Sequence, residues 1–226
     1  MARAFRLHDF LAALPAAPAE LDNTRGVQDW GMMGNDALGD CTEAAKGHLV
    51  TVFTASRGTP VILPTEVIVG AYERECGYDP ANPATDQGGS IAAVLDDWVR
   101  NGLGGYAVSA AAEVNITQLR VQQTVYILGG ADFGIRLPLS AQAQVGRAWD
   151  FAGSAPDAPG GWGGHSVPVV RYDADGVWVV TWGALQFATW RWLMYYADEA
   201  HAVVSPDWAA PVPLDRLAAD LAALGS

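Results

Sequence analysis

The residues best suited to chemistry begin with Cys41, one of only two cysteines in the chain. It stands in the segment "GNDALGDCTEAAKG", residues 34–47, where glycines and carboxylates precede a helix-forming run. A thiol at a helix N-terminus feels a partial positive charge that favours the thiolate, which is the nucleophilic form. Asp40 acts against this, because an adjacent carboxylate disfavours a second negative charge. Cys41 is therefore either a nucleophile or a small buried residue of the helix.

His165 is the candidate base for such a thiol. The chain has four histidines, and this one follows "GGWGG" and opens a predicted strand. An imidazole beside a cysteine can take its proton and form a thiolate–imidazolium pair. The glycines leave space beside the ring, although a histidine in a loop mouth without a catalytic role would have the same surroundings. Because Cys41 and His165 lie in opposite halves of the chain, a cleft between two lobes would have to bring them together.

The elements that must position these residues differ between the two halves of the chain. Helices are predicted over residues 42–55, over residues 65–76 and after Ser90, which is placed to cap its helix. The second half is predicted to hold a helix over 115–128, a short helix over 140–150, an amphipathic helix over 214–224, and strands over 131–139, 165–172, 177–183 and 189–196. The turn "DADG" predicts an antiparallel hairpin between the second and third of these strands. This order indicates an α+β protein in which an N-terminal helical lobe packs on a C-terminal antiparallel β-sheet lobe.

In order and spacing, these segments resemble the papain-like cysteine peptidases. A cysteine opens a helix, and "DQGGSIAAVLDDWVRNGL" resembles the family's Gly-Gly segment and the helix that follows it. "GGHSVPVVRYDADGVWVVTWG" resembles the family's histidine strand, return strand and Trp-Gly signature. The chain looks most like the compact bacterial and phage branch, which has a G-N-D-x-x-G-D-C element.

The resemblance implies a papain-like two-lobe fold and a catalytic pair of Cys41 and His165. It also implies that Asn35, six residues before the cysteine, takes the place of a family glutamine that helps the Cys41 N–H to stabilise an oxyanion. The substrate cleft is expected to run along five residues: Gly88, Gly89, Trp162, Gly164 and Trp182.

One family residue is missing from the pattern. The third catalytic residue of the family is an asparagine two positions before the signature tryptophan, and this chain has Val180 there. Valine cannot orient an imidazole by hydrogen bonding. Thr181 is adjacent, but alternation along a strand is expected to turn it to the other face.

Two functional hypotheses follow. The first is a cysteine hydrolase that cleaves peptide, isopeptide or cell-wall peptide amide bonds through Cys41 and His165. The alternative is a catalytically inactive protein of the same fold that serves as a binding or phage structural module, which the valine at position 180 favours.

The expected domain organisation is simple. Residues 22–210 are predicted to form a single papain-like domain, with a helical half over 22–110 and a sheet half over 111–210. An N-terminal extension over 1–21 precedes this domain, and a C-terminal amphipathic helix over 211–226 follows it.

Composition argues against several other classes of protein. Half of the residues are apolar and 17% are charged, which favours a sizeable core. The net charge of −12 argues against nucleic acid and anionic membranes as partners, so a peptide or protein substrate is expected. No spacing typical of metal ligands and no phosphate-binding glycine loop occurs, so no metal or cofactor is expected. Two cysteines do not make a disulfide framework, which favours a cytoplasmic or phage-associated location over secretion.

Two further features have alternative interpretations. Five of the nine tryptophans crowd the sheet half and could present a sugar-stacking face, although packing in the core and cleft is the simpler interpretation. Four loop carboxylates could bind calcium, but turn roles fit them better; these are Asp79, Asp86, Asp173 and Asp175.

Overall fold

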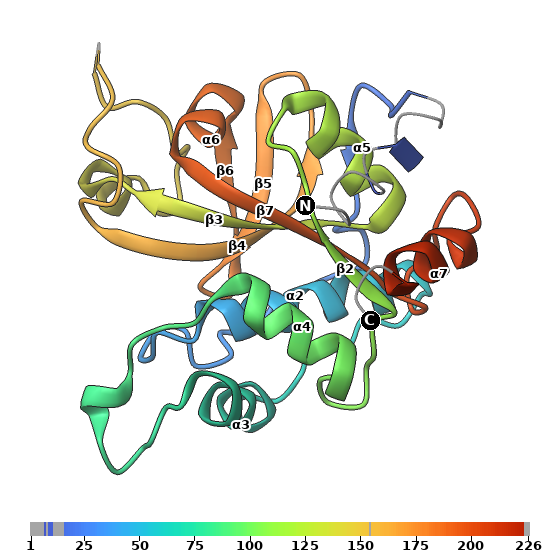
Figure 1. Cartoon of the computed structure of the whole chain (residues 1–226). Coiled ribbons are helices and arrows are strands. Elements are labelled where there is room, and N and C mark those ends of the chain that lie inside the picture. The colour runs from blue at the N-terminus through green and yellow to red at the C-terminus, as the bar shows by residue number, and fades with distance from the viewer. Residues whose placement is uncertain (1–6, 8, 11–15, 154, 224–226) are drawn as a thin grey trace.

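A seven-stranded antiparallel sheet divides the molecule, with helices on both of its faces (Figure 1). The structure is a computed structural model that describes residue 7 and residues 9–10, 16–153 and 155–223. The predicted α+β class, with helices in the first half and an antiparallel sheet in the second, is confirmed. Residues 1–6, 8 and 11–15 of the expected N-terminal extension, and the last three residues of the chain, lie outside the described residues. Within these ranges, no helix combines the length and apolar character needed to cross a membrane.

Three helices cover one face of the sheet: α2 (Cys41–Ser56), α3 (Thr65–Cys76) and α4 (Ile91–Asn101). The sequence predicted all three, and Ser90 caps α4 by accepting a hydrogen bond from the Ala93 N–H. Helix α2 is buried from Thr42 to Thr54, because it lies between the sheet and the other two helices. Cys41 is thus the first residue of the most buried helix in this half.

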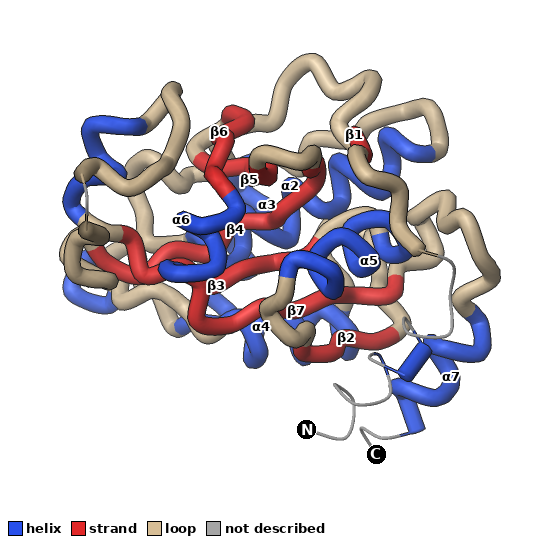
Figure 2. Tube along the Cα trace, turned by 90° about the horizontal axis from the view of Figure 1, so that it is seen from above, coloured by secondary structure: helices blue, strands red, loops and turns tan. Residues whose placement is uncertain are grey.

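The sheet has the strand order β2-β7-β3-β4-β5-β6, and β1 pairs with β4 (Figure 2). The strands are β1 (Leu21–Asp22), β2 (Ala110–Glu113), β3 (Ala131–Leu137), β4 (Gly163–Tyr172), β5 (Gly176–Thr181), β6 (Ala184–Thr189) and β7 (Ala197–Val204). The remaining elements are helices α5 (Gln118–Leu128), α6 (Trp190–Tyr196) and α7 (Asp215–Ala223), with short 3₁₀ segments η1 (Pro83–Thr85) and η2 (Leu139–Gln144). The predicted hairpin of β4 and β5 is present, with the "DADG" turn between them.

Several predicted elements of the second half were wrong. Residues 190–196 form a helix instead of the expected strand, because Thr189 caps it and Trp192, Leu193 and Tyr196 bury one helical face. Strands β6 and β7 flank this helix. Helix α5 is capped by Thr117 rather than by Asn115. The short helix expected over residues 140–150 is the 3₁₀ segment η2.

The alternation of side chains along the strands separates two hydrophobic cores. Val167, Val169 and Val179 face the core that the sheet shares with α5 and α6. Val170 and Val180 face the opposite core, which the sheet shares with α2, α3 and α4. Because side chains alternate with a period of two, this assignment fixes the faces of residues 163–169 in β4 and of all residues in β5, and a β-bulge between Val169 and Arg171 then returns Tyr172 to the first core.

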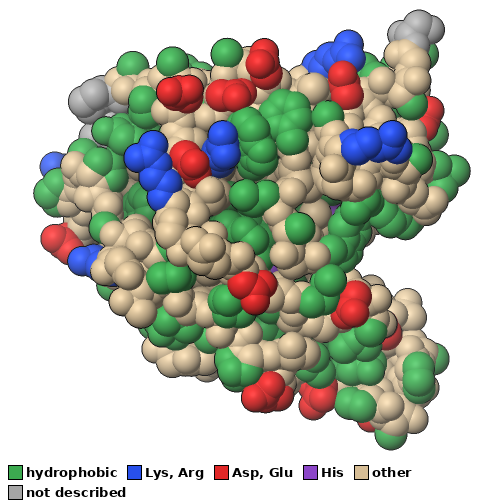
Figure 3. Space-filling view, turned by 180° about the vertical axis from the view of Figure 1, so that it is seen from behind, with side chains coloured by type: hydrophobic (Ala, Val, Ile, Leu, Met, Phe, Trp, Pro, Cys, Tyr) green, Lys and Arg blue, Asp and Glu red, His purple; other side chains and the backbone are tan. Residues whose placement is uncertain are grey.

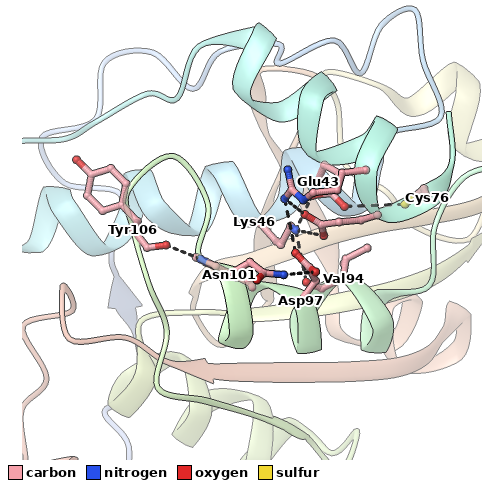
Figure 4. Close-up of polar contacts among 10 residues, drawn as sticks. Glu43, Lys46, Cys76, Val94, Asp97, Asn101 and Tyr106 are labelled. Atoms are coloured by element: carbon pink, nitrogen blue, oxygen red, sulfur yellow. Dashed lines mark hydrogen bonds and ion pairs between the residues drawn. The ribbon is translucent and has the colours of Figure 1, made fainter. Parts of the chain in front are cut away.

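A buried ionic network ties the three helices of the first half together (Figure 4). The fully buried Lys46 lies between two carboxylates, with its Nζ 2.5 Å from Glu43 Oε2 and 2.6 Å from Glu75 Oε2. Its Nζ also donates to the Val94 carbonyl of α4 at 3.4 Å. Arg74, which is half exposed, extends the network from Glu75 towards Asp97. We call these residues the Lys46 network.

Candidate active site

Cys41 reaches the surface of a cleft because a series of turns delivers the chain to the start of α2. The Leu38 and Ala37 N–H groups donate to the Gly34 carbonyl, and the Asn35 N–H donates to the Met32 carbonyl. Asp40 then precedes the helix with its side chain buried and not used as a helix cap. The backbone N–H of Cys41 lies at the first helical position, where no intrahelical acceptor exists.

The wall beside Cys41 is closed by a latch around Asp86. Its Oδ1 accepts hydrogen bonds from the Tyr72 hydroxyl at 2.6 Å and from the Gly39 N–H at 2.9 Å. The Gly88 N–H in turn donates to the Tyr72 hydroxyl. This latch holds the loop before Cys41 against the glycine segment that follows η1.

Glycine is required at position 89 of this wall. A Cβ there would lie 2.6 Å from Cys76 Sγ and 2.7 Å from Thr42 Oγ1, closer than real contacts allow. The predicted cleft residue Gly89 therefore lets one wall approach the first turn of α2 closely, while Gly88 beside it has a positive φ of +77°.

The opposite wall carries His165 near the start of β4. Its Nε2 lies 2.6 Å from Thr181 Oγ1, at the end of β5. The ring stacks on Trp182, with centroids 4.7 Å apart and planes 15° from parallel. Both His165 and Thr181 are buried, at 8% and 5% exposure. The imidazole is thus held at one edge and over one face.

The expectation that Thr181 would point away from His165 was wrong. The alternation along β5 holds, since Val180 faces the helical core and Thr181 does not. However, His165 has the parity of Val167 and Val169 in β4, so it lies on the Thr181 face of the sheet. Val180 stands where the resemblance implies an asparagine, but its side chain packs in the core on the α2 side of the sheet, away from the imidazole.

Cys41 and His165 line one cleft between the two halves of the molecule, with a volume of about 610 Å³. Figure 3 shows the surface deeply hollowed on one side, between the sheet half and the helical half. No hydrogen bond joins Cys41 Sγ to His165 in the described part of the chain. The lining includes Asn35 and the predicted residues Gly88, Gly89, Gly164 and Trp182. Trp162 lies behind Trp182, at a ring-centroid distance of 5.2 Å, and not on the lining itself.

The amide of Asn35 is already engaged. Its Nδ2 donates to Asp40 Oδ1 at 3.0 Å and, more weakly, to the Leu38 carbonyl at 3.4 Å. Burial raises the pKa of Asp40 to about 6, and the Asn35 hydrogen bond opposes that rise. Because the amide nitrogen has two hydrogens, Asn35 can keep its bond to Asp40 and donate to a bound oxyanion once the weaker bond to the Leu38 carbonyl is released.

The electrostatics of the site favour a neutral thiol and a neutral imidazole. Burial raises the pKa of Cys41 to about 11, with the carboxylates of Asp132 and Asp40 adding to the rise. Burial also lowers the pKa of His165 to about 4, with a smaller contribution from His48. At neutral pH the resting pair is therefore uncharged, and the proton must move when a reaction occurs.

Sequence reasoning missed a buried carboxyl next to this site. Asp132 in β3 is 1% exposed and accepts a hydrogen bond from the Ser166 hydroxyl at 2.8 Å, while its Oδ2 has no hydrogen-bond partner. Burial raises the pKa of Asp132 to about 6. Its place in the strand "ADFGIRL" gave no signal, because a single Asp in an apolar run is compatible with either a strand edge or a buried site.

Nothing in the described residues points to a metal centre, since no three His, Cys, Asp or Glu side chains there gather suitably. Asp79 and Asp173 accept hydrogen bonds from turn N–H groups, as expected of turn residues. Asp86 has the latch role given above. Cys41 and Cys76 are both free thiols.

Comparison with known proteins identifies the architecture. No family sequence model matches the chain, and neither does any curated protein sequence. Among solved structures, xylellain, a cysteine protease from Xylella fastidiosa, is similar with a TM-score of 0.65 and 14% identity over 87% of this chain and 88% of that one. The cysteine protease CMS1MS2 from Carica candamarcensis, in complex with E-64, gives a TM-score of 0.60 and 14% identity over 83% and 99% of the two chains.

A third similar structure is the bromelain protease from Ananas comosus in complex with the E64 inhibitor, with a TM-score of 0.58 and 11% identity over 83% of this chain and 99% of that one. At such identities the likeness concerns the fold. The chain therefore has the two-lobe fold of the papain-like cysteine proteases, which confirms the predicted fold class.

Proposed function

We propose that this protein is a cysteine hydrolase that cleaves peptide or isopeptide amide bonds, those of cell-wall peptides included. The observation that carries the proposal is the placement of Cys41 and His165 on facing walls of one cleft. The papain-like fold supports it, because cysteine proteases share this architecture. The element "GNDALGDC" adds the finer proposal of a compact bacterial or phage protein.

The chemistry assigned to the pair is general-base and then general-acid catalysis. As Cys41 Sγ attacks the substrate carbonyl carbon, its proton passes to His165. The C–N bond then breaks, and His165 gives that proton to the departing amine, which leaves a thioester. Water hydrolyses the thioester with His165 again accepting a proton, and the thiol is restored. Because Cys41 and His165 are neutral at rest, proton transfer accompanies the attack.

The oxyanion that forms in this attack needs hydrogen-bond donors. The backbone N–H of Cys41 is one, since the helix leaves it without an internal acceptor. We assign the second to the Asn35 side chain, through the hydrogen that now points weakly at the Leu38 carbonyl. Trp182 covers the imidazole and excludes water from one face of the ring.

The test is turnover by the wild-type chain and a Cys41→Ala variant, with dye-labelled casein and cell-wall stem peptides as substrates. A Cys76→Ala variant is the matched control, because Cys76 is a free thiol in the same half of the molecule. We expect the first substitution to remove cleavage and the second to preserve it. Mass spectrometry with E-64 should show one adduct, on Cys41. Equal cleavage by wild type and Cys41→Ala would refute the proposal.

A non-catalytic peptide-binding module is the second candidate, and specific observations favour it. Burial holds the Cys41 pKa at about 11, and the two hydrogens of the Asn35 amide point at Asp40 and at the Leu38 carbonyl. This candidate predicts that peptides bind in the cleft with no cleavage and that E-64 leaves Cys41 unmodified. The casein and E-64 experiments above therefore decide between the two candidates.

A further inference from the structure

The turn between β5 and β6 has a strained conformation. Thr181 pairs with Ala184, so Trp182 and Gly183 form a two-residue hairpin turn. Both have positive φ, at +46° for Trp182 and +70° for Gly183. A two-residue turn with positive φ at both positions matches the right-handed twist of the two strands that it joins. These positions are usually occupied by glycine, asparagine or aspartate. An aromatic residue there is unfavourable and persists only where its surroundings hold it.

The surroundings of this turn are fixed on both sides. Trp182 stacks on His165 and lies edge-on to the fully buried Trp149, with centroids 6.2 Å apart. A Cβ on Gly183 would lie 3.4 Å from the backbone of Gly31, whose carbonyl oxygen lies 3.1 Å from His48 Nε2 of α2. The turn therefore packs closely on Gly31, which itself contacts His48 of the helix that carries Cys41.

In this conformation two successive residues, Thr181 and Trp182, contact the imidazole of His165. Thr181 Oγ1 contacts the ring edge at Nε2, and the Trp182 ring covers a face. The remaining ring nitrogen, Nδ1, has no hydrogen-bond partner in the described part of the chain. We infer that Thr181 is the positioning residue of His165, which holds Nε2 as the protonated nitrogen and leaves the Nδ1 lone pair to the cleft. The inference rests on the proposed function.

A hydroxyl is suited to both states that the reaction needs. In the resting tautomer, Nε2–H donates to Thr181 Oγ1, and Nδ1 can accept the Cys41 proton. After the transfer both ring nitrogens carry protons, and Oγ1 still accepts from Nε2. A hydroxyl can also donate to Nε2, which would put the proton on Nδ1 and block the base. The function of Thr181 therefore depends on the direction of one hydrogen bond.

Substitutions at position 181 test this role. Thr181→Val keeps the shape and removes the hydroxyl, and Thr181→Ser restores the hydroxyl. We expect the valine variant to lower kcat about 10- to 100-fold at unchanged KM, part of the general-base contribution of about 10²–10⁴. The serine variant should recover most of this loss. Thr124→Val is the matched control, because Thr124 is buried and its Oγ1 has no hydrogen-bond partner.

A second measurement does not require turnover. In ¹⁵N-labelled protein, the two nitrogen shifts of the His165 ring report which nitrogen carries the proton. We expect the Nε2–H tautomer in wild type and in Thr181→Ser, and a mixture of tautomers in Thr181→Val with circular dichroism unchanged. A dominant Nδ1–H tautomer in wild type, or the same tautomer ratio in wild type and Thr181→Val, would overturn the inference. If wild type shows the expected tautomer but cleaves nothing, the proposed function fails and the role of Thr181 as ring anchor stands.

Discussion

The first two turns of α2 contribute to two polar regions that differ in whether their titratable groups are charged. In the Lys46 network, an ammonium group with no exposed surface is met by carboxylates at 2.5 and 2.6 Å. At the cleft, His165 is also buried and Cys41 is half-buried, but no ion pair forms at either of them among the described residues. Burial therefore pushes both pKa values towards the neutral forms.

The difference teaches where this chain keeps charge in its interior and where it avoids charge. Paired ions in the Lys46 network join three helices, and neither partner can be removed without leaving the other uncompensated. The cleft instead holds a thiol and an imidazole that are both neutral at rest and can exchange one proton. The charged Lys46 network thus lies on the same helix as Cys41, whose site is neutral until a reaction occurs.

Removing the cation of the network should have the largest effect. Lys46→Met leaves Glu43 and Glu75 facing each other without compensation, and we expect a loss of about 3–5 kcal/mol in the free energy of unfolding. Burial already raises the pKa of Glu43 to about 7, so the loss should be greater at pH 8 than at pH 5.5. Urea unfolding followed by circular dichroism measures it.

Arg74→Met is the control for this substitution. Its side chain is 52% exposed, and we expect a change below about 1 kcal/mol. An equal loss in the two variants would show that the burial of Lys46 has no special energetic role.

Substitution of the buried carboxyl of Asp132 should have the opposite sign, because it should stabilise the folded chain at high pH. The folded-state pKa of Asp132 is about 6, above its ordinary value of 3.8, so the folded chain binds more protons between these values. The cost of ionising it is absent below pH 3.8 and fully present above pH 6. Relative to wild type, the free energy of unfolding of Asp132→Asn should therefore be about 3 kcal/mol more favourable to the folded state at pH 8 than at pH 3.5.

Unfolding free energies of wild type and Asp132→Asn at these two pH values give that difference. Asp198→Asn serves as the comparison, because its side chain is 48% exposed and pairs only loosely with Arg136. A pH dependence of stability that is the same in wild type and Asp132→Asn would contradict the assigned cost.

The smallest of the three effects concerns the Cys41 thiol. A rise in its pKa from 9.0 to about 11 lowers the thiolate population at pH 7 about 100-fold. Iodoacetamide labelling of Cys41, followed by peptide mass from pH 6 to 10.5, should be slow at neutral pH and climb throughout. Labelling that persists below pH 7 and falls in His165→Ala would instead reveal a preformed ion pair, and would erase the contrast with the Lys46 network.

The parts of the fold that the sequence predicted are those set by local chemistry. Helices α2, α3 and α4 have helical periodicity and clear ends, such as Ser90 and Gly77. The β4–β5 hairpin has a strong turn signal. Strand β2, "AAAE", has little strand propensity and exists because β7 pairs with it. The aromatic run of α6 fits a helix or a strand, and only its packing decides.

The site was predictable in its residues but not in its connections. Cys41 and His165 were proposed from their sequence contexts and Asn35 from the family resemblance, and all three line one cleft in the structure. The Thr181 contact could not be foreseen, because it depends on which sheet face His165 occupies. That face is set by the register of β4 against β3 and β5, which is a property of three strands together.

The chain order of the elements at the site predicts an order in which they assemble. His165, Thr181 and Trp182 lie on β4, β5 and the turn to β6, which are consecutive in the chain and close through short loops. Cys41 joins them only when α2 docks on β4 across more than a hundred residues, a closure with a greater entropic cost. We therefore expect the imidazole and its anchors to assemble early and the nucleophile to arrive late. A folding intermediate of this protein would then contain His165 and its anchors in place without Cys41, and would have no activity until α2 docks on the sheet.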